Sequence, residues 1–386
     1  MRQIPIDFGF REEHDLLRKE ARRFLGERCP MSEVRRLADD PLGHDPTLWK
    51  EIGGLGWLGV ALPEAYGGAG LGSVALCLLL DEMGRRLVPS PFLASLLASF
   101  AIDAGGSESQ KALWLPEIAS GTRIATLALT EPSGGFEPDS VRATASPCEG
   151  GFVLRGQKTH VQDARNAGLV VAPFREPSGQ VSIFAIELPS PGVVIEAEVG
   201  VDPTRRSARV AFEGTRVGAS ARLEAPGAAA LEHAHVRGFA ALAAEMVGAA
   251  DATLELTRQY AIDRKQFGHP IGFFQAVKHP IVDVMVGVEL ARNHALGAAA
   301  AIDHADPCKA ESASRMAKAM ASDVFSLAVR KGVQLHGGYG FTIDCDVHHY
   351  FKRALWSRAT LGDAPHHRHR LAAMLVDRDV LASGAP

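Results

Sequence analysis

The sequence predicts a multidomain α+β fold: an N-terminal helical domain, a middle β-barrel domain and a C-terminal four-helix bundle, at residues 1–122, 123–225 and 226–386. Two observations lead to this prediction. The chain has 386 residues, more than the ~250–300 residues that a single hydrophobic core usually supports. The spacing of apolar residues also changes from a helical to a strand-like period near Arg123, and it becomes helical again near Ala228.

The first domain is expected to be helical because its apolar residues recur on one helix face. Leu17, Ala21, Phe24 and Leu25 stand at i, i+4, i+7 and i+8. Pro63 and the glycines of A-Y-G-G-A-G-L-G interrupt this pattern. A second apolar helix is expected through V-A-L-C-L-L-L-D-E-M-G, which follows directly.

The middle domain is expected to be a β-structure. Phe152 and Leu154 alternate with smaller or polar neighbours, and Ala208, Val210 and Phe212 share one side of a predicted strand. The runs L-V-V-A-P and V-S-I-F-A-I-E-L are rich in β-branched and aromatic residues. Glycine and proline separate these runs at short intervals, which favours a compact sandwich or barrel.

The last domain is rich in alanine and has three long helical patterns, at residues 240–261, 282–296 and 314–330. Small residues allow helices to approach one another closely, so we expect these helices to pack as a four-helix bundle.

Composition excludes several classes of partner. The formal net charge is -4, so no bulk positive field attracts nucleic acid or anionic lipid. The five cysteines are scattered without a C-x-x-C pair, which favours reduced thiols. The N-terminal M-R-Q-I-P-I-D-F has no apolar signal core, and no run of about 18 apolar residues occurs. We therefore expect a soluble, cytoplasmic protein that binds neither nucleic acid nor membrane.

The first candidate ligand-binding segment is Y-A-I-D-R-K-Q-F-G-H-P-I-G-F-F-Q, at residues 260–275. Arg264 offers a fork of donors suited to a pyrophosphate, Phe267 could cover a flat ring, and Gln275 could bind a ribose or an adenine edge. The alternative is a helix end with a surface arginine and a packed phenylalanine.

The second candidate segment is V-Q-L-H-G-G-Y-G-F, at residues 333–341. Gly337 and Gly338 permit a positive φ, and the exposed N–H groups of such a turn suit a phosphate. A glycine cap without any ligand is the alternative, and the segment taken alone favours it.

Together, in this order and at this separation, the two segments resemble the flavin-binding signatures of the acyl-CoA dehydrogenase family. L-A-L-T-E-P-S-G-G at 127–135 resembles the family's T-E-P-x-x-G-S-D, and G-Q-K-T-H-V-Q-D-A at 156–164 resembles its G-x-K-x-W-I-T-N-A. L-P-E-A-Y-G-G-A-G at 62–70 matches a further loop of the family. The resemblance covers essentially the whole chain, including the domain order.

The resemblance implies that FAD binds between the barrel and the bundle, with a neighbouring subunit completing the site. Leu129 and Thr130 would contact the isoalloxazine, and Ser133 would touch the acyl-CoA. The other residues that the resemblance assigns to FAD are His160, Val161 and Gln162 beside the ring, and Arg264, Phe267, Gln275, Gln334, Leu335, His336, Gly337 and Gly338 on the adjacent protomer.

The resemblance also implies a reaction. A carboxylate removes the α-proton of an acyl-CoA thioester while the β-hydrogen leaves as hydride to flavin N5. Abstracting a weakly acidic proton requires a base whose pKa is raised by burial, and donors that stabilise the developing enolate. Electron-transferring flavoprotein is the usual electron acceptor of the family.

The identity of this base is open. The position that usually carries the catalytic glutamate aligns with Gly362, and the alternative position on the long helix falls near Gly238. Asp363, one residue later, could act as a displaced base, since Gly362 would let the backbone come closer. Alternatively, a partner chain supplies the carboxylate and this chain is a non-catalytic subunit that shares the FAD site, or Glu232 or Glu245 serves. Of these last two, Glu245 is expected to pack or pair within the bundle.

The L-G-D-A-x-H-H and K-T-H-V-Q-D segments resemble the smaller subunits of two-component acyl-CoA dehydrogenases that act on pimeloyl-, dicarboxylyl- or steroid side-chain CoA esters. A homotetramer or an α2β2 heterotetramer is therefore expected, and a flavin oxidase of the same fold is a further alternative. His366, His367 and His369 lie too close in sequence to offer ligands from separate elements, so we expect no metal site.

Overall fold

A computed structural model describes residues 12–304 and 306–377. The N-terminal segment in which no signal core is expected lies outside these residues. The chain forms two compact units. The bundle unit contains the described residues up to Val34, Gly72–Val88 and the described residues from Phe239 onward, and the sheet unit contains Arg35–Leu71 and Pro89–Gly238.

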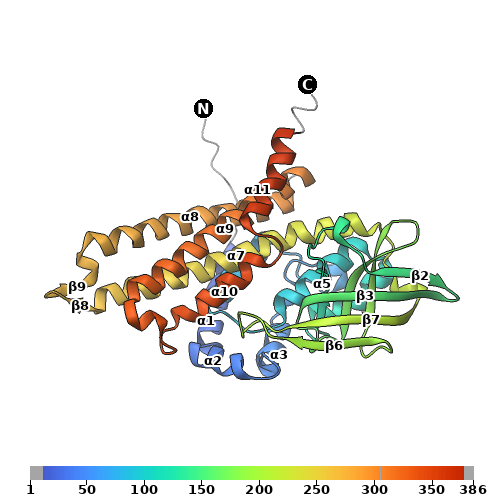
Figure 1. Ribbon diagram of the computed structural model, residues 1–386, viewed down its shortest axis with the longest axis horizontal. Helices are drawn as coiled ribbons and strands as arrows, with labels where there is room; N and C mark the ends of the chain where they lie inside the picture. Colours follow the sequence, from blue (N-terminus) through green and yellow to red (C-terminus); the bar gives the residue numbers. More distant parts are fainter. Residues whose placement is uncertain (1–11, 305, 378–386) are drawn as a thin grey trace. The chain divides into compact units, whose positions relative to one another are not determined.

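Long helices build the bundle unit. The three predicted helical patterns of the last domain lie within α7 (Gly227–Asp263), α8 (Gln275–His304) and α9 (Pro307–His336), so these predictions are confirmed. The helices α8 and α9 lie side by side along their length (Figure 1). The other helices of the unit are α1 (Glu12–Arg28), α4 (Gly72–Arg85), α10 (Val347–Ala359) and α11 (Ala364–Ala372). Both α2 (Met31–Asp39) and α7 contribute residues to each of the two units.

Glycine allows α4 and α7 to meet backbone to backbone. A Cβ atom added to Gly84 would lie 2.0 Å from the carbonyl oxygen of Glu245, and one added to Gly248 would lie 1.8 Å from that of Asp81. Real Cβ atoms do not approach an oxygen so closely, so both positions require glycine. Small residues thus let α4 and α7 approach one another closely.

Side-chain caps fix where the last helices begin. Asp306 accepts a hydrogen bond from the Lys309 backbone N–H at the start of α9, and Pro307 follows this cap. Gly337, with φ 61°, ends the same helix. Asp363 caps α11 in the same manner, with 3.0 Å between its Oδ1 and the N of His366.

The sheet unit is built on one curled sheet of seven strands: β1 (Ala125–Leu127), β2 (Thr144–Cys148), β3 (Gly151–Gln162), β4 (Leu169–Arg175), β5 (Val181–Glu187), β6 (Val193–Glu198) and β7 (Ser207–Gly218). The strand order is β1-β4-β2-β3-β7-β6, and β5 pairs with β4. The helices α3 (Pro46–Gly54), α5 (Phe92–Gly105) and α6 (Glu108–Ala119) belong to the same unit.

Three packed aromatic rings lie in the hydrophobic core of the sheet unit. Phe174 packs edge-to-face on Phe184 and on Phe212, with centroids 5.7 and 5.0 Å apart. Ala208, Val210 and Phe212 are all buried, as their alternation predicts. The predicted fold class, with an N-terminal helical region, a curled sheet and a C-terminal helical bundle, is confirmed. Within the described residues, no helix is both long and apolar enough to cross a membrane.

Candidate flavin and acyl-CoA site

The candidate residues fall in both units, and each half is described by itself. In the sheet unit, a backbone hydrogen bond of 2.8 Å runs from Thr159 N to Thr130 O. The hydroxyl of Thr126 donates to the carbonyl oxygen of Gln162 at 2.6 Å. These bonds place the predicted residues Leu129 and Thr130 directly beside the predicted segment from His160 to Gln162.

A β-bulge shapes this segment. The pairing of β3 with β7 shifts between Lys158 and Val161, and His160 has a φ of 54°. The His160 backbone N–H donates to Glu198 at 2.8 Å, and its ring is three-quarters exposed. The Val161 side chain instead packs in the sheet core. A bulge re-aims the side chains around it, which is a common device beside binding sites.

A buried ion pair that the sequence reasoning missed joins the same two segments. The Nζ atom of Lys158 lies 2.8 Å from Oε1 of Glu131, and the two side chains are 0% and 5% exposed. The Glu131 carboxylate also accepts hydrogen bonds from the backbone N–H groups of Arg142 and Ala143. Burial lowers the pKa of Lys158, and the hydrogen bond that Lys158 donates to Glu131 opposes this shift. The only signal for this pair in the sequence was an acidic residue in one segment and a basic residue in the other.

A cavity of about 280 Å³ in the sheet unit adjoins the bulge. Its lining includes Asp163, Glu198, Arg205 and Arg206. Burial raises the pKa of Asp163 to about 6, although the charge of Arg205 opposes the shift. Ser133, the predicted substrate contact, is exposed in the loop after β1.

The second half of the candidate site lies at one end of the bundle unit. Tyr260 near the end of α7 stacks on His336 at the end of α9, with ring centroids 4.3 Å apart. The Nδ1 atom of His336 lies 2.8 Å from the Gly332 carbonyl oxygen, which fixes the ring against its own helix. The two segments predicted to bind a dinucleotide therefore meet within this unit.

Arg264 and Phe267 lie on this end as exposed side chains. Arg264 follows α7 and precedes the hairpin of β8 (Lys265–Gln266) and β9 (His269–Pro270), where Phe267 is 88% exposed with a φ of 55°. The Phe267 ring contacts Phe274 edge-to-face, directly before Gln275 at the start of α8. The three predicted side chains thus lie in the segment that runs from the end of α7 through the hairpin to the start of α8.

The glycine turn after α9 is open to a ligand. Among the described residues, no atom lies within 4 Å of a Cβ placed on Gly337 or Gly338. Both glycines and Gln334 are exposed, Leu335 is half-buried and His336 is buried. Since exposed N–H groups in such a turn suit a phosphate, the turn offers a donor set of the predicted kind.

The candidate bases differ sharply in their surroundings. Asp363 is half-buried at the start of α11, where it caps the helix. Glu245 is buried and forms an ion pair with Arg353, with 2.6 Å between Oε1 and Nη1, so the expectation that Glu245 pairs within the bundle is confirmed. Glu232 is exposed on α7, and Gly238 is buried.

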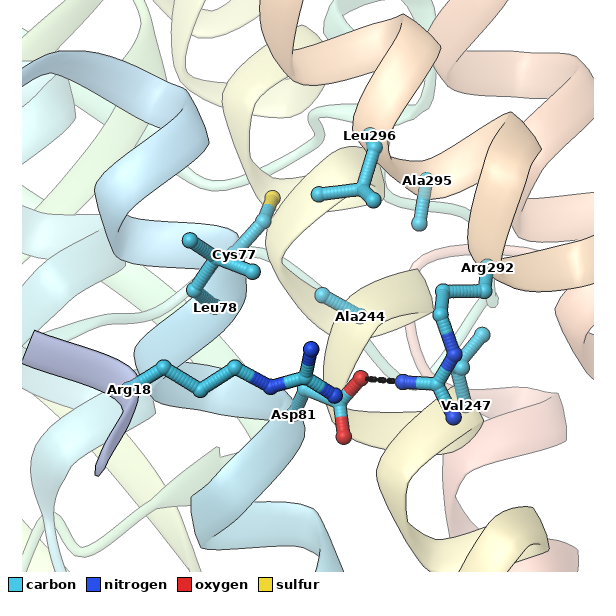
Figure 2. A pocket seen from close by; sticks show the side chains of 9 residues that line it. All are labelled: Arg18, Cys77, Leu78, Asp81, Ala244, Val247, Arg292, Ala295 and Leu296. Atoms are coloured by element: carbon cyan, nitrogen blue, oxygen red, sulfur yellow. Dashed lines mark hydrogen bonds and ion pairs between the residues drawn. The ribbon is translucent and has the colours of Figure 1, made fainter. Parts of the chain in front are cut away.

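A small cavity of about 20 Å³ in the bundle unit is lined by Cys77, Asp81 and Arg292 among others (Figure 2). Arg292 forms ion pairs with both Asp81 and Asp251. Burial raises the pKa of Asp81 to about 6, and the charge of Arg292 opposes this shift. The cavity has space for one water molecule and excludes any larger ligand.

Comparison with known proteins assigns the family. The models of the acyl-CoA dehydrogenase N-terminal, middle and C-terminal domains match residues 11–122, 126–215 and 227–376. Acyl-CoA dehydrogenase IpdE2 of Mycobacterium tuberculosis is 34% identical over 346 residues, covering 89% of this chain and 91% of the relative.

Two solved structures show the same fold. A variant of the Tcur3481-Tcur3483 steroid ACAD is 32% identical with a TM-score of 0.87, covering 97% of this chain and 99% of that one. The ChsE4-ChsE5 complex from Mycobacterium tuberculosis is 27% identical with a TM-score of 0.88, covering 96% and 99%. This chain therefore belongs to the acyl-CoA dehydrogenase family.

Proposed function

We propose that this chain is an FAD-dependent acyl-CoA dehydrogenase that introduces an α,β double bond into an acyl-CoA thioester. The observation that carries the proposal is the joining of Thr130 to Thr159, because it brings together the two sheet segments that resemble the flavin-facing segments of the family. FAD, when bound, supplies the acceptor for the β-hydride.

The residues present fit this cofactor. Backbone N–H groups of the open Gly337–Gly338 turn and the exposed guanidinium of Arg264 are donors suited to a pyrophosphate. Exposed Phe267 offers a flat apolar surface, and Gln275 offers an amide, for the adenosine part. Leu335 and the buried His336 would support the turn from α9.

The sheet residues would position the reacting ring. Leu129, buried, and Thr130, half-buried, present apolar and hydroxyl groups at the end of β1. His160 and Gln162 flank the bulge beside them, and the buried Val161 side chain limits its contact to the backbone. Ser133 in the following loop is proposed to contact the acyl-CoA.

Asp363 is the proposed base. Its Oδ1 accepts the hydrogen bond from His366 N, so Oδ2 is the oxygen that would take the substrate's α-proton. The buried ion pair with Arg353 commits Glu245 to the bundle interior, and Glu232 is exposed. Electron-transferring flavoprotein is the proposed acceptor of the electrons.

A second candidate is a non-catalytic subunit of a hetero-oligomeric acyl-CoA dehydrogenase. Glycine at both usual base positions, Gly362 and Gly238, favours it. Two of the similar structures are named as pairs of chains, Tcur3481-Tcur3483 and ChsE4-ChsE5. In this case a partner chain supplies the carboxylate, and the assembly is an α2β2 heterotetramer in place of a homotetramer.

Anaerobic titration of the purified protein separates these candidates. The flavin absorbance is followed while straight-chain, dicarboxylyl and steroid side-chain CoA esters are added to the native protein and to Asp363→Asn. Bleaching of native protein and a loss of bleaching in the variant support Asp363. Equal bleaching of both removes Asp363 as the base, and bleaching only after a second acyl-CoA dehydrogenase chain is added identifies the non-catalytic subunit. A colourless protein that takes up no FAD refutes the proposal.

A further inference from the structure

We infer that Lys318 and His367 hold the Leu361–Gly362 turn between α10 and α11 and thereby set the position of Asp363. They are positioning residues, since each acts through the turn and not on the substrate. The inference rests on the proposed function, because it assigns the turn a role only if Asp363 takes the α-proton.

The turn has an unusual backbone. Leu361 has a φ of 56° and Gly362 a φ of 87°, so two consecutive residues lie in the left-handed region. Glycine adopts this region freely, but leucine does so only under strain. Strain of this kind persists where the surroundings fix the conformation, and it is concentrated at functional sites. Asp363 follows this pair directly.

Two buried side chains fix the carbonyl groups of these two residues. The Nζ atom of Lys318 on α9 donates to the Gly362 oxygen at 2.8 Å and to the Ser322 hydroxyl at 3.1 Å. The Nε2 atom of His367 on α11 lies 2.9 Å from the Leu361 oxygen. Both side chains belong to residues that are 0% exposed. A carbonyl oxygen only accepts, so Nε2 of His367 carries the hydrogen.

Charge distinguishes the two positioning residues. Burial lowers the pKa of His367 to about 3, with Lys318, Arg315 and His366 adding to the shift, so the ring is neutral at pH 7. Burial lowers the pKa of Lys318 to about 7, and the charge of Asp363 opposes that shift. Lys318 therefore changes its charge near pH 7, and the negative charge of Asp363 favours its protonated form.

Other charged groups of α9 and α11 form ion pairs, such as Arg368 with Asp323. Arg315, one helical turn before Lys318, forms an ion pair with Glu311 at 2.7 Å and lies over the Phe239 ring. The edge of the Phe239 ring also packs against His367, with centroids 4.6 Å apart. A neutral donor would suffice to bind the Gly362 carbonyl oxygen. Burying a charged lysine costs more free energy than burying a neutral donor, but a lysine also places a positive charge near Asp363.

The test uses the flavin-containing protein, reconstituted with its second chain if turnover requires one. Lys318→Met removes the donor and the charge, Lys318→Arg keeps both, and Lys309→Met removes an exposed lysine from the same helix. The rate constant for flavin reduction by an acyl-CoA ester is measured from pH 6 to pH 9. We expect Lys318→Met to keep its flavin, to reduce it roughly 10–100-fold more slowly and to lose the pH dependence near 7. Lys318→Arg should recover part of the rate, and Lys309→Met should behave as native protein.

A second pair of variants covers the case in which Lys318→Met does not fold. His367→Gln can place an amide N–H where Nε2 lies, whereas His367→Leu cannot. We expect the glutamine variant to retain more of the rate than the leucine variant at equal flavin content. Equal rates in these two variants, or a native rate and pH profile in a folded Lys318→Met, overturn the inference.

Two variants distinguish the positioning role of Lys318 from the role of Asp363 as base. If Asp363→Asn is inactive while Lys318→Met is native in rate and profile, the positioning role alone is wrong. If Asp363→Asn reduces flavin at the native rate, the base assignment is wrong and the positioning role falls with it.

Discussion

The ion pair of Glu131 and Lys158 offers a sharp test of how the sheet half of the site is held. The substitution Glu131→Gln removes the carboxylate charge but keeps one oxygen for the backbone N–H groups of Arg142 and Ala143. The pair is 0% and 5% exposed, so water cannot take over the lost interaction. Breaking a buried pair by removing one partner costs about 3–5 kcal/mol of stability. We expect a loss near ~3 kcal/mol, because the retained oxygen of the glutamine still accepts the backbone hydrogen bonds.

The lost stability should depend on pH. Burial already lowers the pKa of Lys158 in the native protein, against the effect of Glu131. Without that carboxylate, the pKa of Lys158 in the folded state should fall further below its value in the unfolded state, which is about 10.4. Between the pKa of Lys158 in the folded state and its pKa in the unfolded state, the unfolded state binds more protons. The free energy of unfolding of the variant therefore rises with pH in this interval.

The assay is urea unfolding of the flavin-loaded protein at pH 7 and pH 9. Glu149→Gln, in the exposed turn before β3, is the matched control and should change stability by less than about 0.5 kcal/mol. The double variant Glu131→Gln/Lys158→Met should lose less than the sum of the single variants, with a coupling of roughly 0.5–3 kcal/mol. Additive losses, or a Glu131→Gln variant as stable as the control, would refute the argument.

Three further predictions concern the bundle unit. Glu245→Gln should destabilise by about 3–5 kcal/mol in urea unfolding, because it removes the carboxylate charge that pairs with the buried Arg353. Gly248→Ala should lower the Tm and cost about 1–3 kcal/mol or more, since its Cβ would lie 1.8 Å from a backbone oxygen. Asp81 has a pKa of about 6 against an ordinary 3.8, so the folded state binds the extra proton and native stability falls as pH rises through that window. Asp81→Asn should abolish this fall, and an unchanged pH profile would contradict the assignment.

Local pattern was enough to predict the longest helices of the bundle unit and several strands of the sheet. The alternation of Ala208, Val210 and Phe212 predicts a strand face that is buried in the structure. The alanine-rich runs predict helices because their apolar positions repeat at the helical period. These signals act within ten to twenty residues, and the sequence displays them directly.

Long-range contacts were not predictable from such patterns. The helices α1 and α4 group with the last helices of the chain, and the bond from Cys77 Sγ to Ala240 O joins residues 163 positions apart. Glu131 and Lys158 meet only because β3 folds back beside the loop after β1. No periodicity in a single sequence reports which of many charged residues will meet in this way.

The histidines near the C-terminus show how a sequence cluster separates in three dimensions. His366, His367 and His369 lie on one short helix, where residues one and three apart cannot all share a face. His367 is buried and holds the Leu361 carbonyl oxygen, His366 is half-buried, and His369 is exposed. A metal would need three ligand atoms that converge, whereas these side chains occupy three environments. The chemistry of the cluster therefore resides in its buried member, whose single hydrogen bond fixes a strained turn beside Asp363.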